Sequence, residues 1–384
     1  MSRSFVCALA LALAAVVVAA PAVAAPAVAP GNTPLATWQA QGRVRTLAIA
    51  NGVVYLGGSF TTLFSHGTRS TVVRHHLAAI DEATGAPTSW NPNVNGNVQT
   101  IRVIGKRVYI GGSFTSVGGH PVRNVAAIGR ASGRLVTTFR AAANATVNAL
   151  AASGSTLYLG GAFTRVDGAA HRHLGAVALG TGAVRGGFRG GTSGVVNALL
   201  DDSTSGRLYV GGNFSRIDGL LRPYLGAVGQ VRGAAFRWGT PPLGQVWSLA
   251  LAPSGPLYAA VGGHEGGQLD SYDAATGRRR WQRFADGDVQ AVALAGNEVL
   301  AGGHFLNACD TNQGGGSPWV CTVPVGRNRL FATDASGALQ PWNPGANSLY
   351  GVWAVRADAG HVVAGGDFTI VDGSHQARFV EFTS

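Results

Sequence analysis

Short segments in which apolar and polar residues alternate recur along the whole chain. The clearest begin with a valine and occupy residues 98–101, 147–150, 196–199, 246–249 and 289–292. Alternation with a period of two is typical of a strand that is buried on one face. The pattern therefore predicts many short β-strands. The 57 glycines agree with it, because glycine inside a helix costs about 1 kcal/mol relative to alanine.

A second pattern repeats along the chain, in which apolar residues precede two glycines and, in most copies, a phenylalanine. Full copies occupy residues 54–60, 108–114, 157–163 and 208–214, and weaker copies occupy 257–260, 299–305 and 363–368. Paired glycines in a strand indicate that another backbone approaches closely. A third strand, a turn and a fourth strand with an aromatic residue follow (Trp90, Phe139, Trp281 or Trp342). Seven such units, each with four antiparallel strands, predict an all-β, seven-bladed β-propeller.

The two ends of the chain predict how the ring of blades closes. The last unit reaches only a third strand, at residues 378–382, whereas residues 35–39, which include Trp38, precede the first unit. An N-terminal strand that completes the C-terminal blade would pair both open edges. We therefore expect the N-terminal strand to close the last blade.

The repeated phrases resemble the delta-60 repeat, a propeller-forming unit of exported bacterial proteins of unknown function. The resemblance covers residues 38–382 and depends on Gly-Gly-x-Phe-Thr, Val-Asp-Gly, a basic residue before the third strand, and Thr-Gly before the aromatic strand. It implies a propeller fold and export, and it transfers no catalytic residue. Kelch propellers share the paired glycines, and the segment from Asp273 to Trp281 also fits the quinoprotein repeat.

The N-terminus has the pattern of an export signal. Arg3 supplies a positive charge, an apolar run covers residues 5–20, and Ala22-Val23-Ala24 forms a small-residue cleavage site. We therefore predict a secreted, extracellular protein with no membrane span once the signal is removed. The predicted organisation is a signal peptide over 1–24, a Pro/Ala-rich mature N-terminus over 25–33 and a single propeller domain over 34–384.

Two cysteines remain after removal of the signal, which contains Cys7. Cys309 and Cys321 flank a stretch rich in glycine, and in an oxidising compartment such a pair is most simply a disulfide. A metal site at this place would have only His304 and Asp310 as further ligands. We expect a disulfide between Cys309 and Cys321, no metal and no cofactor.

The formal net charge of +11 has two explanations. Lys106 is the only lysine, and arginine in place of lysine beside much alanine, glycine and valine is what a GC-rich genome produces. The charge also fits attraction to an anionic cell-wall polymer or acidic polysaccharide. Both explanations stay open. We expect a monomer with no nucleic-acid partner.

The loops between second and third strands of a propeller open on the same face as the connections between blades. Polar lining of this kind is typical of a site for a polar or anionic ligand. The candidate ligand-binding residues on this face are His75, His76, Arg123, His171, Arg172, Arg222, Arg329, Arg378, Asn91 and Asn144.

A structural role competes with ligand binding at these positions, because a basic residue precedes the third strand in nearly every unit. Such residues would hold loop carbonyls or pair locally, as Asp167 with Arg172 or Asp218 with Arg222. The histidines at non-repeating positions are then the better ligand candidates. These are His75, His171 and His264.

The sequence favours a binding or scaffold module over an enzyme. It contains no Gly-x-Ser-x-Gly, His-Glu-x-x-His or phosphate-binding loop. Asp286, Asp288 and Glu265 are the only acidic group to consider for glycoside cleavage. The expected function is non-catalytic binding of cell-wall or extracellular polysaccharide. The alternatives are an extracellular hydrolase, lyase or quinoprotein-like oxidoreductase, or a purely structural assembly module.

Overall fold

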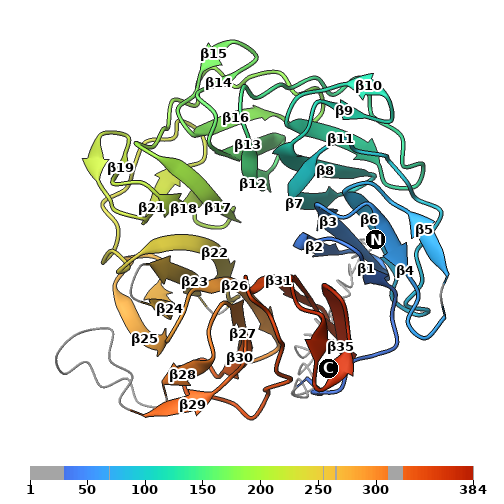
Figure 1. Cartoon of the computed structure of the whole chain (residues 1–384). Helices are drawn as coiled ribbons and strands as arrows, with labels where there is room; N and C mark the ends of the chain where they lie inside the picture. Colours follow the sequence, from blue (N-terminus) through green and yellow to red (C-terminus); the bar gives the residue numbers. More distant parts are fainter. Residues whose placement is uncertain (1–29, 69, 254, 264–265, 310–322, 384) are drawn as a thin grey trace, which may run out of the picture.

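The computed structural model describes residues 30–383 apart from 69, 254, 264–265 and 310–322. All regular structure in this part of the chain is β-strand, and it holds no helix that is long and apolar enough to cross a membrane. The sheets stand side by side around a common axis (Figure 1). The predicted signal peptide and cleavage site lie outside the described residues.

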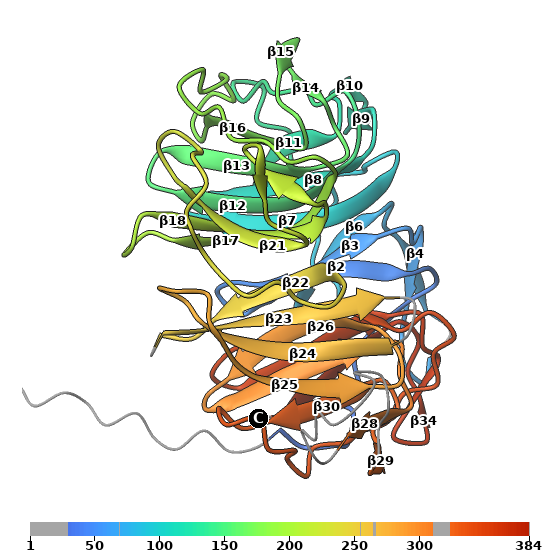
Figure 2. The same cartoon turned by 90° about the vertical axis from the view of Figure 1, so that its left-hand side faces the viewer.

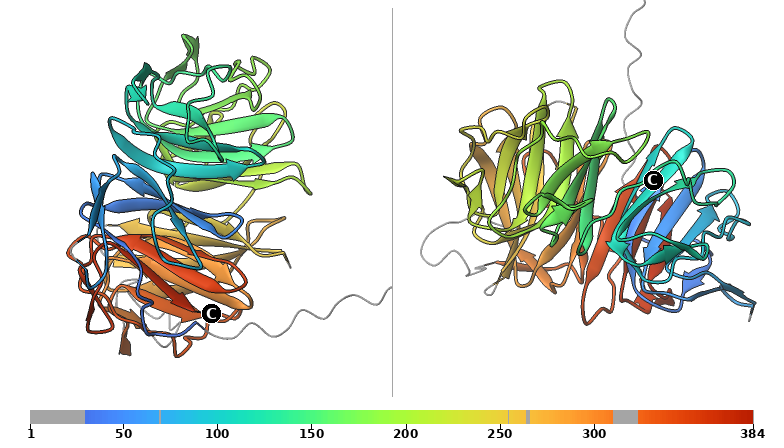
Figure 3. Two further views of the ribbon diagram at one scale, coloured as in Figure 1. Left: turned by 90° about the vertical axis from the view of Figure 1, so that its right-hand side faces the viewer. Right: turned by 90° about the horizontal axis from the view of Figure 1, so that it is seen from above.

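The first strand of each unit lies nearest the axis (Figure 1). Each of these strands contacts the first strand of the next unit in chain order, and β31 in turn contacts β2. We call the boundary between the sheets of β31 and β2 the closing seam; Figure 3 shows these sheets side by side. The first strands are β2 (Val44–Ile49), β7 (Asn97–Ile104), β12 (Val147–Ser153), β17 (Val195–Asp202), β22 (Gln245–Leu251), β26 (Val289–Ala295) and β31 (Val352–Ala357).

The second strand forms the middle of each sheet and pairs antiparallel with the first and the third. The second strands are β3 (Val53–Gly58), β8 (Arg107–Ser113), β13 (Thr156–Gly161), β18 (Arg207–Asn213), β23 (Pro256–Gly263), β27 (Glu298–Gly303) and β32 (His361–Gly366). The third strands are β6 (Leu77–Asp81), β11 (Val125–Gly129), β16 (Leu174–Ala178), β21 (Leu225–Gly229), β24 (Gly266–Asp273), β30 (Leu330–Thr333) and β35 (Phe379–Thr383).

The prediction of four strands in every unit is wrong for most of the described sheets. Only the sheet of β22, β23 and β24 has a full fourth strand, β25 (Arg279–Ala285). Elsewhere the fourth segment makes an isolated bridge to the third strand, as between Ile128 and Leu135, and then turns. The physical reason is the aromatic side chain: Phe139 is buried between two sheets, where it packs edge-to-face on Tyr109, so its backbone leaves the sheet edge.

Small hairpins replace plain loops between most second and third strands, and Figure 2 shows β4, β28, β29 and β34 on one side of the ring. The short strand β1 (Gln39–Ala40) pairs with β4. The hairpins are β4 (Thr62–Phe64) with β5 (Thr71–Val73), β9 (Ser116–Val117) with β10 (His120–Pro121), β14 (Arg165–Val166) with β15 (Ala169–Ala170), β19 (Arg216–Ile217) with β20 (Leu220–Leu221), β28 (Asn307–Cys309) with β29 (Pro324–Gly326), and β33 (Ile370–Val371) with β34 (Ser374–His375).

The paired glycines allow neighbouring sheets to approach closely, as the sequence predicts. A Cβ atom on Gly211 would lie 2.5 Å from Cγ1 of Val246 in the next sheet. The same relation holds across the closing seam, where a Cβ atom on Gly365 would lie 2.5 Å from Cγ1 of Val44. The last and first sheets therefore pack like sheets that are consecutive in the chain.

The N-terminal segment runs beside the last sheet. The backbone N–H of Gly31 donates to Thr383, and that of Leu35 donates to Glu381, both at 2.8 Å. Trp38 packs against the apolar cluster between the last and first sheets, and its backbone N–H donates to Gly85. The segment is regular strand only at β1, so it follows β35 as expected without forming a continuous fourth strand.

Candidate functional site

Every first strand contains a β-bulge directly after its leading valine. In β2, for example, the pairing with β3 shifts between Val44 and Thr46, which leaves Arg45 unpaired. A bulge bends the strand and redirects one side chain. The bulged residues are Arg45, Gln99, Asn148, Asn197, Trp247, Gln290 and Trp353.

Most of the bulged side chains line one cavity on the axis, which we call the central channel. Its volume is about 310 Å³, near the lower limit of small-molecule sites. Among the described residues that line it, none is acidic. Its polar and aromatic lining consists of Arg45, Arg102, Arg356, Asn148, Asn197, Trp247, Trp353, Thr46, Thr100 and Ser248.

Arginine and aromatic side chains meet at the end of the channel nearer the bulges. The guanidinium of Arg45 lies 4.3 Å from the centroid of the Trp353 ring, and Trp353 packs edge-to-face on Trp247. Burial lowers the pKa of Arg45, the neighbouring Arg43 lowers it further, and Asp367 raises it. Arg45 thus presents a cation that no carboxylate within the described lining neutralises.

Arg43 and Asp367 form an ion pair beside this group, across the closing seam. Nε of Arg43 lies 2.6 Å from a carboxylate oxygen of Asp367, and the indole N–H of Trp353 also donates to Asp367, at 3.2 Å. Arg43 further lies over the ring of Tyr350, which is largely exposed. The pair fixes the orientation of the Trp353 ring against which Arg45 stacks.

Two more arginines lie deeper in the channel. Nε of Arg102 donates to the carbonyl of Leu150 at 3.1 Å, and Arg356 donates to the carbonyl of Val355 at 2.7 Å. Burial, and then the like charge of Arg102, lowers the pKa of Arg356 to about 10. Two cations held at this depth favour an anion in the channel, because an anion would offset their repulsion and desolvation.

Asparagines complete the wall of the channel. The Asn148 amide donates to the carbonyl of Val196 at 3.3 Å, and the Asn197 amide donates to the carbonyl of Val246 at 3.4 Å. Each bond joins one first strand to the next. The amides therefore hold the channel wall together and leave their side chains beside the cavity.

Several predicted ligand residues occupy a repeated backbone position before the third strand. Here His76 has φ of 62°, its N–H donates to Phe60, and its carbonyl accepts from Gly58. Arg329 and Arg378 take the same conformation and the same pair of backbone bonds. A structural role in the backbone turn, rather than ligand binding, therefore accounts for the residues at this repeated position. Arg329 also donates through its side chain to the carbonyls of Ser348 and Phe305.

The predicted aspartate–arginine pairs are wrong. In the described part of the chain Asp167 makes no ion pair with Arg172; it accepts from the backbone N–H of Ala142 at 2.8 Å. Asp218 likewise makes no ion pair there with Arg222, which donates to the carbonyl of Leu221. Both aspartates have the same left-handed turn conformation, with φ of 47°, and in that turn the Asp167 side chain bonds the preceding connection.

The remaining rim candidates do not converge on one site. His171 and Arg172 line a cleft of about 450 Å³ on the rim, and Arg123 lines a separate cleft of about 700 Å³. His171 is buried, which lowers its pKa, whereas Asn91 is exposed and His75 is half-buried.

Other polar candidates have structural partners. Asn144 accepts from the backbone N–H groups of Thr164 and Arg165, and Asp286 accepts from those of Leu306 and Asn307, so both hold a hairpin in place. Asp288 accepts from the N–H of Gly263 at 2.9 Å.

Four candidates lie outside the described residues, and a fifth depends on one of them. Glu265, His264, Asp310 and Cys321 belong to segments that the structure does not describe. Cys309 is buried at the end of β28. The disulfide between Cys309 and Cys321 and the role of Glu265 therefore stay predictions.

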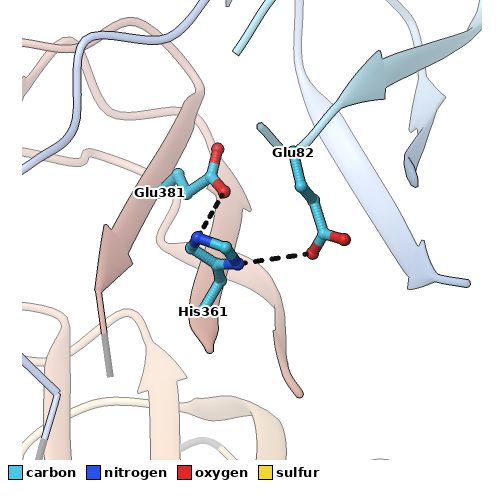
Figure 4. Close-up of side chains that lie close together, drawn as sticks. All are labelled: Glu82, His361 and Glu381. Atoms are coloured by element: carbon cyan, nitrogen blue, oxygen red, sulfur yellow. Dashed lines mark ion pairs between the residues drawn. The ribbon is translucent and has the colours of Figure 1, made fainter. Parts of the chain in front are cut away.

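Among the described residues, one group of side chains could bind a metal ion. Glu82, His361 and Glu381 have possible ligand atoms within 4.8 Å of one another (Figure 4). This group lies on the closing seam, at the end of β32 opposite to the paired glycines.

Comparisons with known proteins concern the fold. No model of a protein family matches the chain, and no curated protein matches it. A chain in the structure of the mitotic checkpoint complex is similar over 98% of this chain and 99% of its own length, with a TM-score of 0.59 and 16% identity. The WD40 β-propeller domain of Doa1 is similar over 91% and 97%, with a TM-score of 0.55 and 10% identity.

The chain has a β-propeller fold. A computationally designed protein, Ika8, is also similar, over 92% of this chain and 100% of its own, with a TM-score of 0.54 and 14% identity. Identities this low show the fold alone, so the site must be interpreted from this propeller's own residues.

Sequence reasoning missed the central channel, although a signal was present. In each first strand the residue after the leading valine is arginine, glutamine, asparagine or tryptophan. The alternating pattern predicts an ordinary strand at this position and gives no sign of a bulge. In β22 the bulge lies opposite Val261 and Ala260, whereas in the other first strands it lies opposite paired glycines, which let the neighbouring backbone approach closely. A Cβ atom on Gly58 would lie only 2.0 Å from the carbonyl oxygen of Arg43.

Proposed function

We propose that the chain is an exported, non-catalytic propeller of seven blades that binds an acidic saccharide of a cell-wall or extracellular polymer in the central channel. The observation that carries the proposal is the lining of the channel: Arg45, Arg102 and Arg356 face one cavity without an acidic residue among its described lining. Arginine binds carboxylate and sulfate oxygens through charge-assisted hydrogen bonds.

Two further features of the channel support a sugar over a bare anion. Trp247 and Trp353 supply rigid apolar rings, and Tyr350 offers an exposed ring beside Arg43. The cavity of about 310 Å³ matches a small group rather than a folded partner. An acidic sugar has both the charge and the apolar ring face that this lining complements.

Support for seven blades, closure and export comes from the chain itself. The repeated Gly-Gly pattern, the contact between β31 and β2, and the packing of Trp38 favour closure through the N-terminal segment. The N-terminal apolar run and the resemblance to the delta-60 repeat favour export.

Binding of a short oligogalacturonate, measured by isothermal titration calorimetry, tests the proposal. A neutral gluco-oligosaccharide of the same length is the ligand control. We expect the mature protein to bind only the acidic oligomer. Arg45→Gln should weaken its affinity about tenfold, the cost of one hydrogen bond between charged groups.

A rim variant is the matched control. Arg123→Ala, Arg172→Ala and Arg222→Ala together remove three charges without touching the described channel lining. This variant should change the affinity less than about threefold, because exposed charges act mainly through screened long-range attraction. The proposal fails if the unaltered protein binds no acidic oligomer. Loss of binding in the rim variant with retention in Arg45→Gln would instead place the site on the rim.

A further inference from the structure

A compact group of titratable side chains lies on the closing seam, away from the central channel. The imidazole of His361, at the start of β32, stands between two carboxylates (Figure 4). Nδ1 lies 3.8 Å from Oε1 of Glu82, and Nε2 lies 3.9 Å from Oε1 of Glu381. These separations exceed a hydrogen bond, so neither glutamate is bonded directly to the ring.

The two glutamates are buried with unsatisfied oxygens. The side chain of Glu381 is 1% exposed and that of Glu82 is 6% exposed. Oε1 of each has no hydrogen-bond partner among the described residues, although both atoms point toward His361. A buried carboxylate oxygen without a partner is costly, and an ion would satisfy both at once.

The other seams show what normally occupies this place. In the sheets of β8, β13 and β18, a tyrosine of the second strand pairs with an alanine of the third, as Tyr109 does with Ala127. Each tyrosine hydroxyl donates to a carbonyl just past the third strand of the next sheet, at Leu179, Gln230 and Ala274.

In the last sheet the tyrosine and alanine are replaced by Val363 and Glu381. Glu82, directly after β6, holds the place that Leu179 holds after β16. His361 pairs with Thr383, so Glu381 is its diagonal neighbour on the same face of the sheet. At the closing seam three ionisable side chains therefore occupy the place where other seams have a neutral hydrogen bond between a tyrosine hydroxyl and a carbonyl.

We propose that Glu82, His361 and Glu381 bind one divalent transition-metal ion across the closing seam. Two carboxylate oxygens and one imidazole nitrogen form a mixed donor set that favours ions such as Zn²⁺ over Ca²⁺ and Mg²⁺, which prefer oxygen alone.

The electrostatics of the group agree with a bound cation. Burial raises the pKa of Glu381 to about 7; His361 lowers it, and Glu82 and Asp358 raise it further. Burial likewise raises the pKa of Glu82, as does Asp358 beside it. Burial and like charge thus disfavour the ionised carboxylates in the absence of a cation, and a divalent ion between them would favour the ionised form.

Metal binding to the mature, untagged protein tests the inference. The protein is stripped with a chelator and titrated with Zn²⁺ in competition with a chromophoric chelator, and bound metal is counted by mass spectrometry after gel filtration. We expect one Zn²⁺ ion per chain at this site. Glu381→Gln and Glu82→Gln should each weaken the affinity about 100-fold, because each removes a ligand rather than a supporting group.

Glu298→Gln is the matched control. Glu298 begins β27 at the position that His361 occupies in β32, and burial raises its pKa as well, so its removal should leave Zn²⁺ binding unchanged. Circular dichroism establishes that each variant folds. His361→Ala, at a side chain that is 30% exposed, replaces any glutamine variant that does not. Absence of bound Zn²⁺, or equal affinity in the folded ligand variants, overturns the inference.

Discussion

The closing seam and the seams between consecutive sheets share their packing but differ in their chemistry. Gly365 meets Val44 at the closing seam as Gly211 meets Val246 at a consecutive one. At three of the consecutive seams a tyrosine hydroxyl donates to a carbonyl of the next sheet. The closing seam instead has charged groups at both ends, with Arg43 and Asp367 near the channel and the Glu82 cluster opposite.

This difference follows from how the two kinds of seam are formed. Consecutive sheets are joined by a segment of chain that runs directly from one to the next, which already limits how they meet. The last and first sheets come from opposite ends of the chain, and Arg43 and Asp367 are separated by 324 positions. Directional ion pairs and the N-terminal segment then define the alignment of two sheets that no short connection joins. The proposed metal site lies at this seam, and the ion pair of Arg43 and Asp367 borders the central channel there.

The largest effect on stability is expected from substitutions that test whether the closing seam and a consecutive seam are packed equally tightly. Gly365→Val should destabilise the protein by about 3 kcal/mol or prevent folding, because the new side chain collides with Val44 in a filled interface. Gly211→Val, at a consecutive seam, should cost about the same. Urea unfolding followed by circular dichroism measures both.

Gly360→Ala is the control for this pair, because a Cβ atom there meets no atom within 4 Å. It should change the free energy of unfolding by less than about 0.5 kcal/mol. If Gly365→Val were as mild as Gly360→Ala while Gly211→Val unfolded the protein, the last and first sheets would not pack together in solution.

The second prediction concerns a carboxylate at a consecutive seam. Asp270 is fully buried and accepts from the hydroxyl of Tyr272 at 2.7 Å, within the cluster between the sheets of β18 and β23. Burial raises its pKa to about 6, against the lowering effects of Tyr272 and Arg279. The folded state therefore binds more protons than the unfolded state between about pH 4 and pH 6, and stability falls as pH rises through that range.

Unfolding in urea at pH 4.5 and pH 7 measures this effect. Asp270→Asn should remove about 1–3 kcal/mol of the loss of stability that the unaltered protein shows on going from the lower to the higher pH. A pH dependence that is the same in both proteins would show that Asp270 titrates at its ordinary pKa. The cluster at the closing seam would then differ more from this buried carboxylate at a consecutive seam.

The smallest effect on stability is expected from removing the ion pair that distinguishes the closing seam. Asp367→Asn breaks the ion pair with Arg43, whose side chain is partly exposed, so the free energy of unfolding should change by less than about 1 kcal/mol. The same change removes a negative charge beside Arg45 and should strengthen binding of oligogalacturonate a few-fold by calorimetry. Unchanged or weaker binding would contradict the place of Arg43 and Arg45 in the site.

Local patterns made the sheets predictable from sequence. The paired glycines and the alternating segments place the first, second and third strands within a few residues of where they lie, because both signals depend on neighbours in the same unit. The fourth segments were not predictable in the same way. Trp90 and Phe139 have strand-like surroundings in sequence, but their rings are buried between sheets, which draws the backbone from the sheet edge.

The candidate sites depended on information that the sequence pattern does not carry. His76 and Arg329 look like ligands because they are polar and lie in a loop, yet the backbone conformation that they share explains them. Glu82, His361 and Glu381 meet because the last and first sheets pack together, and no local spacing along the chain indicates this contact. The acidic residue Glu381 was visible at a position where the other third strands have alanine or serine, and it marks the seam in retrospect.

The bulge in each first strand has a consequence for how such proteins diverge. In five sheets it directs one side chain to the channel, and this position holds arginine, asparagine or tryptophan while the valine before it stays the same. Natural selection, or an engineer with a small combinatorial library, could therefore alter ligand preference at Arg45, Asn148 or Trp247 without redesigning the scaffold.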